Sequence, residues 1–178
     1  MPFLDVMHTY FRGEKLEALW FIVPIGVALL VLAGVALRVE RGGFAWGIAI
    51  PAVLFGLVLL GTGIGVGART SGQVAALDQQ HRTEPAALRT AELARMEVVN
   101  ASFRTYFITS GVVAALGLIL VFAVPTDWAR GAGAVLLLVA SLVLLIDGFA
   151  SRRAEPYVAA LEALPAPPTD PAPAPAPR

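Results

Sequence analysis

Four long stretches of this chain carry almost no charge, and they constrain its fold more than any other feature. They cover residues 18–37, 44–67, 105–125 and 130–150, and their only charged side chains are Asp147 and, at one edge, Arg130. A helix of about 20 apolar residues crosses the hydrocarbon core of a bilayer, and helices satisfy their own backbone there. We therefore predict an all-α, polytopic membrane protein in which residues 14–164 form a four-transmembrane-helix bundle of two antiparallel hairpins.

The composition favours a membrane and excludes several classes of function. Hydrophobic residues make up 57% of the chain and charged residues 15%, against about 25% charged in soluble domains. The 13 basic residues are balanced by 13 acidic ones and form no dense basic stretch, so no nucleic-acid partner is expected. There is no cysteine, which excludes disulfides, thiolate nucleophiles and Cys-ligated metals. Both histidines lie outside the apolar stretches, so we predict no cofactor and no metal site.

The distribution of Lys and Arg predicts the orientation. The connections on one side of the bilayer carry three basic residues, and the other side carries ten, namely Arg12, Lys15, Arg69, Arg82, Arg89, Arg95, Arg104, Arg152, Arg153 and Arg178. The side richer in basic residues faces the cytoplasm. Because Arg far outnumbers Lys and Ala and Gly are abundant, we interpret the source as bacterial. The prediction is an inner-membrane protein with both termini and residues 69–104 in the cytoplasm.

The polar segments are predicted to form short helices on the cytoplasmic face. Residues 1–13 show an apolar and a polar side at helical spacing, which is typical of an interfacial amphipathic helix or a docking helix. In the segment 69–104, Thr70 and Gln73 have capping-box spacing, and Pro85 suits the first turn of a second helix. That helix either ends before the third span or continues into it. Charges of alternating sign along that second helix indicate a solvated face. Residues 156–164 predict one more short helix.

The last residues, 165–178, are half proline. Such a segment has nothing to bury, and it predicts a disordered tail or, alternatively, an extended Pro-rich ligand for a partner.

Glycines predict where the helices pack. Residues 61–67 contain two overlapping Gly-x-x-x-Gly pairs, which permit close approach of helix backbones in lipid. The full set of predicted packing glycines is Gly43, Gly47, Gly61, Gly63, Gly65, Gly67 and Gly111. Whether these glycines pack within one chain or between chains is left open.

Asp147 is the charged residue most deeply placed in an apolar stretch. A carboxylate inside a bilayer is costly unless it has a partner or reaches the interface. We predict an ion pair with Arg69 or Arg104 at the membrane edge. The alternatives are a coupling site for proton or cation movement and simple snorkelling to the headgroups. Pro24 and Pro51 interrupt the first two spans, and the bends they predict suit either gating or an inert helix.

The function predicted from these features is structural. No nucleophile–base pair, metal cluster or paired carboxylates occur within the spans, so we predict that the chain is not an enzyme. The first hypothesis is an assembly or accessory role, in which the protein oligomerises or binds other membrane-protein subunits. A small transporter or channel with Asp147 as coupling residue is the alternative. A sensor that uses the cytoplasmic segment as its readout is a further one.

Overall fold

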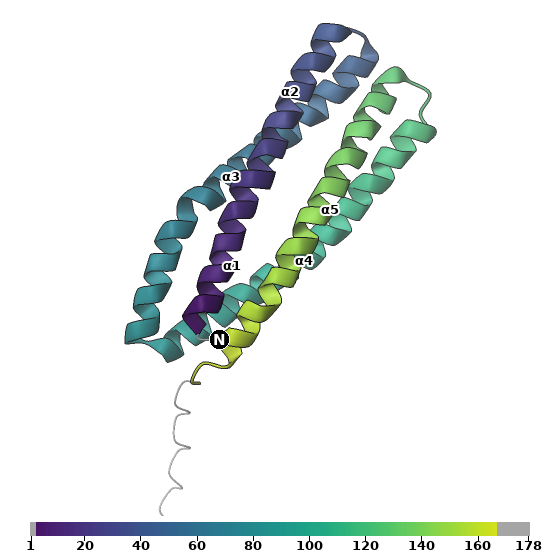
Figure 1. Ribbon diagram of the computed structural model, residues 1–178. Coiled ribbons are helices and arrows are strands. Elements are labelled where there is room, and N and C mark those ends of the chain that lie inside the picture. The colour runs from purple at the N-terminus through teal and green to yellow at the C-terminus, as the bar shows by residue number, and fades with distance from the viewer. Residues whose placement is uncertain (1–2, 167–178) are drawn as a thin grey trace, which may run out of the picture.

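The structure, a computed structural model, describes residues 3–166, and these form long helices joined by short connections (Figure 1). The elements are α1 (Phe3–Glu17), the π-helical segment η1 (Ala18–Ile22), α2 (Val23–Val39), α3 (Gly43–Thr83), α4 (Pro85–Phe122) and α5 (Asp127–Glu162). Residues 3–166 contain no strand, so the predicted all-α fold is confirmed. Four helices are long and apolar enough to span a membrane, with α1, η1 and α2 forming the first.

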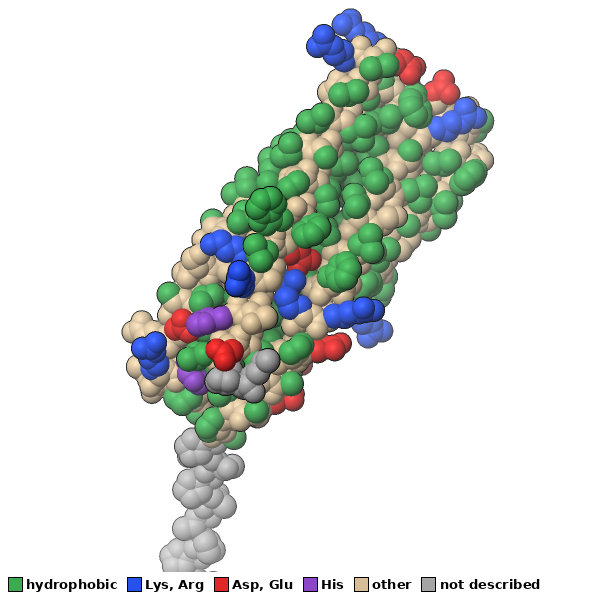
Figure 2. All heavy atoms as spheres, in the orientation of Figure 1, with side chains coloured by type: hydrophobic (Ala, Val, Ile, Leu, Met, Phe, Trp, Pro, Cys, Tyr) green, Lys and Arg blue, Asp and Glu red, His purple; other side chains and the backbone are tan. Residues whose placement is uncertain are grey.

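The helices are longer than a bilayer requires. With 41 residues, α3 extends about 60 Å at 1.5 Å per residue, roughly twice the hydrocarbon thickness. Charged side chains gather at the two ends of the molecule, with hydrophobic ones between them (Figure 2). We call residues 3–17, 69–104 and 151–162 the polar end. The opposite loop end holds the connections at residues 40–42 and 123–126.

The structure differs from the prediction of separate short helices at the polar end. α1 passes through Gly13 and continues into the first span, so residues 3–13 are not a separate interfacial helix. Thr70 is not a helix cap but lies inside α3, where its hydroxyl donates to the carbonyl of Val66 at 2.6 Å. Pro156 lies inside α5. The predicted start at Pro85 is confirmed. The predicted tail, 165–178, lies almost entirely outside the described residues.

The helices continue into the polar end because they pack there around a hydrophobic core. We call it the second hydrophobic core, because the apolar region has a core of its own. Met7 and Phe11 from α1 are fully buried there, together with Leu88 of α4 and Tyr157 and Leu161 of α5. The rings of Tyr10 and Tyr157 stack with centroids 4.6 Å apart. Because packing of an apolar face supplies most helix stability in proteins, these contacts extend each helix beyond the apolar span.

Within the apolar region, α3 and α5 lie at the centre. α2 packs on α3, α4 packs on α5, and α3 contacts α5. A core of small and branched side chains joins α2, α3 and α5, formed by Leu29, Ala33, Ala49, Ala52, Val135 and Val139. This arrangement places α2 and α4 on the flanks of the bundle.

The π-helical segment η1 has a local cause in Pro24. Proline has no N–H, and its ring collides with the carbonyl four residues earlier in an α-helix, here that of Trp20. The wider π turn at Ala18–Ile22 lies directly before α2, in whose first turn Pro24 stands. Pro51, in contrast, lies within α3, which runs unbroken from Gly43 to Thr83.

Candidate functional site

Glycines face one another where the helices cross. A Cβ atom added to Gly26 of α2 would lie 2.9 Å from the carbonyl oxygen of Gly56 in α3. In the same way, a Cβ on Gly117 of α4 would lie 3.0 Å from the carbonyl oxygen of Gly133 in α5, and one on Gly133 would lie 2.6 Å from that of Gly117. Distances this short leave no room for any side chain. The bundle is therefore held by direct backbone approach, as expected in lipid.

The third crossing joins the two central helices. A Cβ on Gly47 of α3 would lie 2.1 Å from the carbonyl oxygen of Trp128, and one on Gly131 of α5 would lie 2.4 Å from that of Phe44. Gly47 was among the predicted packing residues. The other five glycines of the three crossings were not predicted, and none of them stands in a Gly-x-x-x-Gly pair.

The remaining predicted glycines divide into two groups. Gly63 and Gly67 pack against η1, next to Val23 and Leu19, and Gly43 is in ordinary contact with Trp128. By contrast, no atom lies within 4 Å of a Cβ placed on Gly61, Gly65 or Gly111. Of the two overlapping pairs, one packs within the chain and the other faces outwards.

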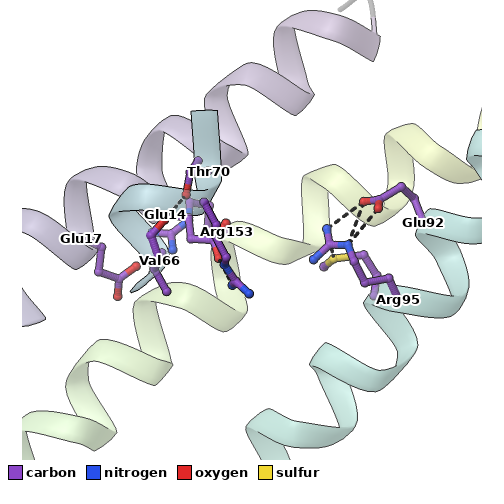
Figure 3. A network of polar contacts seen from close by, with 9 residues as sticks. Glu14, Glu17, Val66, Thr70, Glu92, Arg95 and Arg153 are labelled. Atoms are coloured by element: carbon purple, nitrogen blue, oxygen red, sulfur yellow. Dashed lines mark hydrogen bonds and ion pairs between the residues drawn. The ribbon is translucent and has the colours of Figure 1, made fainter. Parts of the chain in front are cut away.

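A half-open cavity of about 260 Å³, which we call the chamber, lies between the helices where they leave the apolar region. Its charged lining comes from Glu14 and Glu17 of α1, Arg69 of α3, Arg95 of α4 and Arg153 of α5. Arg153 forms an ion pair with Glu17 (Figure 3), and Arg69 pairs with Glu14 at 3.2 Å. These pairs tie α1 to both central helices.

Two polar atoms of the chamber remain buried without a hydrogen-bond partner among the described residues. They are Oε2 of Glu14 and Nε of Arg153. Such atoms cost free energy unless water or a ligand reaches them. These two atoms therefore lower the stability of the polar end.

A second charged group, the Glu92 network, is buried next to the chamber. Glu92 is only 6% exposed. It accepts hydrogen bonds from Nε and Nη2 of Arg95 (Figure 3) and from the hydroxyl of Tyr157 at 2.8 Å. Arg95 lies over the ring of Phe11. The predicted solvated face of this helix is therefore wrong at Glu92.

Burial and the neighbouring Glu92 carboxylate raise the pKa of Tyr157 above its ordinary value. Burial also raises the pKa of Tyr10, which stacks on it. Both phenols therefore stay protonated at neutral pH, and Tyr157 acts as a permanent hydrogen-bond donor to the carboxylate.

The predicted ion pair of Asp147 does not form in the structure. Asp147 is half-buried on α5 and makes no ion pair with any residue in the range 3–166, while Arg69 is bound by Glu14. Arg104 is exposed on α4. The reason is the continuous first helix, which brings Glu14 alongside α3 as a competing carboxylate. Glu14 precedes the first apolar stretch in the sequence, and the sequence predicted no continuous helix that would carry it alongside α3.

A smaller pocket of about 160 Å³ lies further along α4, towards the loop end. Phe55, Thr109 and Ser110 line it, and Tyr106 lines both this pocket and the chamber. Within residues 3–166, no group of three His, Asp or Glu side chains is placed to hold a metal ion.

Comparisons with protein-family models, with curated proteins and with solved structures find no match to this chain.

Proposed function

We propose that this chain is a non-enzymatic protein of the bacterial inner membrane with a role in assembly, either as a homo-oligomer or as a subunit that binds other membrane proteins. The excess of Lys and Arg at the polar end supports placing that end in the cytoplasm. In this placement, the α2–α3 and α4–α5 pairs are two transmembrane hairpins, and the second hydrophobic core is a cytoplasmic extension of the bundle.

A strip of small residues on the outer face of α3 carries the proposal. It consists of Gly61 and Gly65 in the apolar stretch and of Ala68 and Gly72 at its polar edge, all exposed and spaced like the contact positions of a coiled coil. Beyond the neighbouring backbone of α3 itself, no atom of the described residues lies within 4 Å of a Cβ on any of the three glycines. Between helices in lipid, association depends on close packing of small residues rather than on the hydrophobic effect. The chain uses this device internally at three crossings, and the strip offers the same surface to another helix.

The test is the mass of the purified protein in mild detergent. We expect a complex heavier than the 18.7 kDa chain, and we expect Gly61→Leu combined with Gly65→Leu to reduce it. Gly34→Leu is the matched control, because Gly34 also has open space around it but lies on α2. A wild-type protein that is strictly monomeric and carries no partner would contradict the assembly role.

Transport is the second candidate, and the chamber and the smaller pocket, which share Tyr106, favour it. The chamber and the smaller pocket follow each other along α4. Thr109 and Ser110 supply hydroxyl groups to the smaller pocket. Reconstituted vesicles test this role by proton flux. Transport predicts a flux that Asp147→Asn abolishes and that Asp127→Asn, at the exposed loop end of the same helix, leaves unchanged. Vesicles that are as tight as protein-free ones would reject it.

A further inference from the structure

Two apolar grooves flank a ridge on the outer face of α5. The larger, about 450 Å³, lies between the first helix, with Leu16 and Phe21, and α5. The smaller, about 280 Å³, is lined by Leu144, Gly148 and Arg152. Leu145 and Phe149 line both grooves, and they are 60% and 65% exposed. These two side chains therefore form the ridge that separates the grooves.

The grooves lie at the depth of the apolar span, next to its polar end. Residues 142–149 belong to the fourth apolar stretch, and Arg152 follows within one turn of Phe149. The smaller groove stays open because nothing lies within 4 Å of a Cβ on Gly148. At this depth, apolar side chains offer water no hydrogen bonds. The acyl chains of lipids therefore occupy such grooves on the surface of a membrane protein.

The charges at the polar end of the grooves differ between the two. Arg153 borders the larger groove, but its charge is neutralised by Glu17. Arg152 borders the smaller groove, is exposed, and forms no ion pair within residues 3–166. Arg152 therefore offers a guanidinium, unpaired among the described residues, at the polar end of the smaller groove, whereas Asp147, likewise unpaired there, does not line that groove. The guanidinium is complementary to an anionic headgroup.

We infer that this face binds one anionic diacyl phospholipid of the surrounding bilayer. Its two acyl chains lie on either side of the Leu145–Phe149 ridge, one in each groove, and its phosphate contacts the guanidinium of Arg152. The inference rests on the bilayer placement proposed above and is independent of the assembly role.

Native mass spectrometry of the full chain, released from nanodiscs that contain phosphatidylglycerol and phosphatidylcholine, tests the inference. We expect one phosphatidylglycerol to stay bound in preference to phosphatidylcholine. Arg152→Gln should lower its retention about fivefold, the effect of one basic residue near an anionic surface. Gly148→Leu should lower retention by filling the smaller groove.

Two controls isolate the site. Arg104→Gln removes another exposed arginine of the polar end, on α4, and Gly34→Leu adds a side chain at another open glycine. Both should retain the lipid as the wild type does. Equal retention by Arg152→Gln and its control, or no preference for phosphatidylglycerol, would overturn the inference. The protein mass in the same spectrum reports oligomerisation separately, and failure to enter nanodiscs would reject the bilayer placement itself.

Discussion

Glu92 is the most deeply buried charged residue of the described chain. A buried carboxylate is tolerated only when it is paired and hydrogen-bonded, and here Arg95 and Tyr157 supply both. The three-residue spacing of Glu92 and Arg95 allows this pair on one helix. It could not indicate Tyr157, which lies 65 residues away and reaches Glu92 only because α4 and α5 pack together at the polar end.

Removing the Tyr157 hydroxyl should destabilise the protein. Tyr157→Phe leaves one oxygen of a buried carboxylate short of a donor, and hydrogen bonds to charged groups contribute about 2 kcal/mol. Denaturant titration in mild detergent measures the change in the free energy of unfolding. Tyr106→Phe is the control, since Tyr106 is 52% exposed, and it should change stability by less than about 0.5 kcal/mol. Equal stabilities of the two variants would contradict the role of the hydroxyl.

The same tyrosine predicts a loss of stability in alkali. The pKa of Tyr157 is raised in the folded protein, whereas an unfolded tyrosine titrates near pH 10. As the pH rises, Tyr157 therefore loses its proton in the unfolded chain before it does so in the folded protein. Its contribution to the free energy of unfolding is complete below about pH 10 and declines above it, by about 1 kcal/mol from pH 10 to 11. Unfolding titrations at these two pH values should show a smaller decline in Tyr157→Phe. An identical decline in both proteins would show that the phenol is not protected.

At the scale of helices, the sequence predicted the spans well and their ends poorly. A long apolar stretch has few alternatives in lipid, and Pro85 predicted a helix start correctly. The polar segments were predicted as short helices because glycine and proline, here Gly13 and Pro156, have low intrinsic helix propensity. In the structure, packing around Tyr157 and Phe11 overrides that propensity, and such packing between distant segments cannot be deduced from local spacing.

The glycine crossings predict opposite effects for two equal substitutions. Gly47→Ala should destabilise the bundle by about 1–3 kcal/mol, because its Cβ would meet the carbonyl oxygen of Trp128 and push α3 from α5. Gly34→Ala has open space and should stabilise α2 by up to about 1 kcal/mol through helix propensity. Thermal unfolding in detergent compares the two variants. A Gly47→Ala protein as stable as Gly34→Ala would argue against close backbone contact.

The whole molecule combines a membrane bundle with a packed polar end. Charge distribution alone predicted the asymmetry between the two ends, because nine of the 13 basic residues belong to the segments of the polar end. The chamber was not predicted, although all its charged residues are visible in the sequence. Its assembly depends on a continuous first helix that brings Glu14 and Glu17 next to Arg69 and Arg153.

Cysteine labelling in intact cells tests the central claim, a four-span protein with its polar end in the cytoplasm. The chain has no native cysteine, so each introduced one reports alone. We expect Gln79→Cys at the polar end to resist a membrane-impermeant maleimide until the cells are opened. Arg41→Cys and Thr126→Cys, in the two connections of the loop end, should be labelled from outside. Labelling of Gln79→Cys in intact cells, with protection of the other two, would contradict the account.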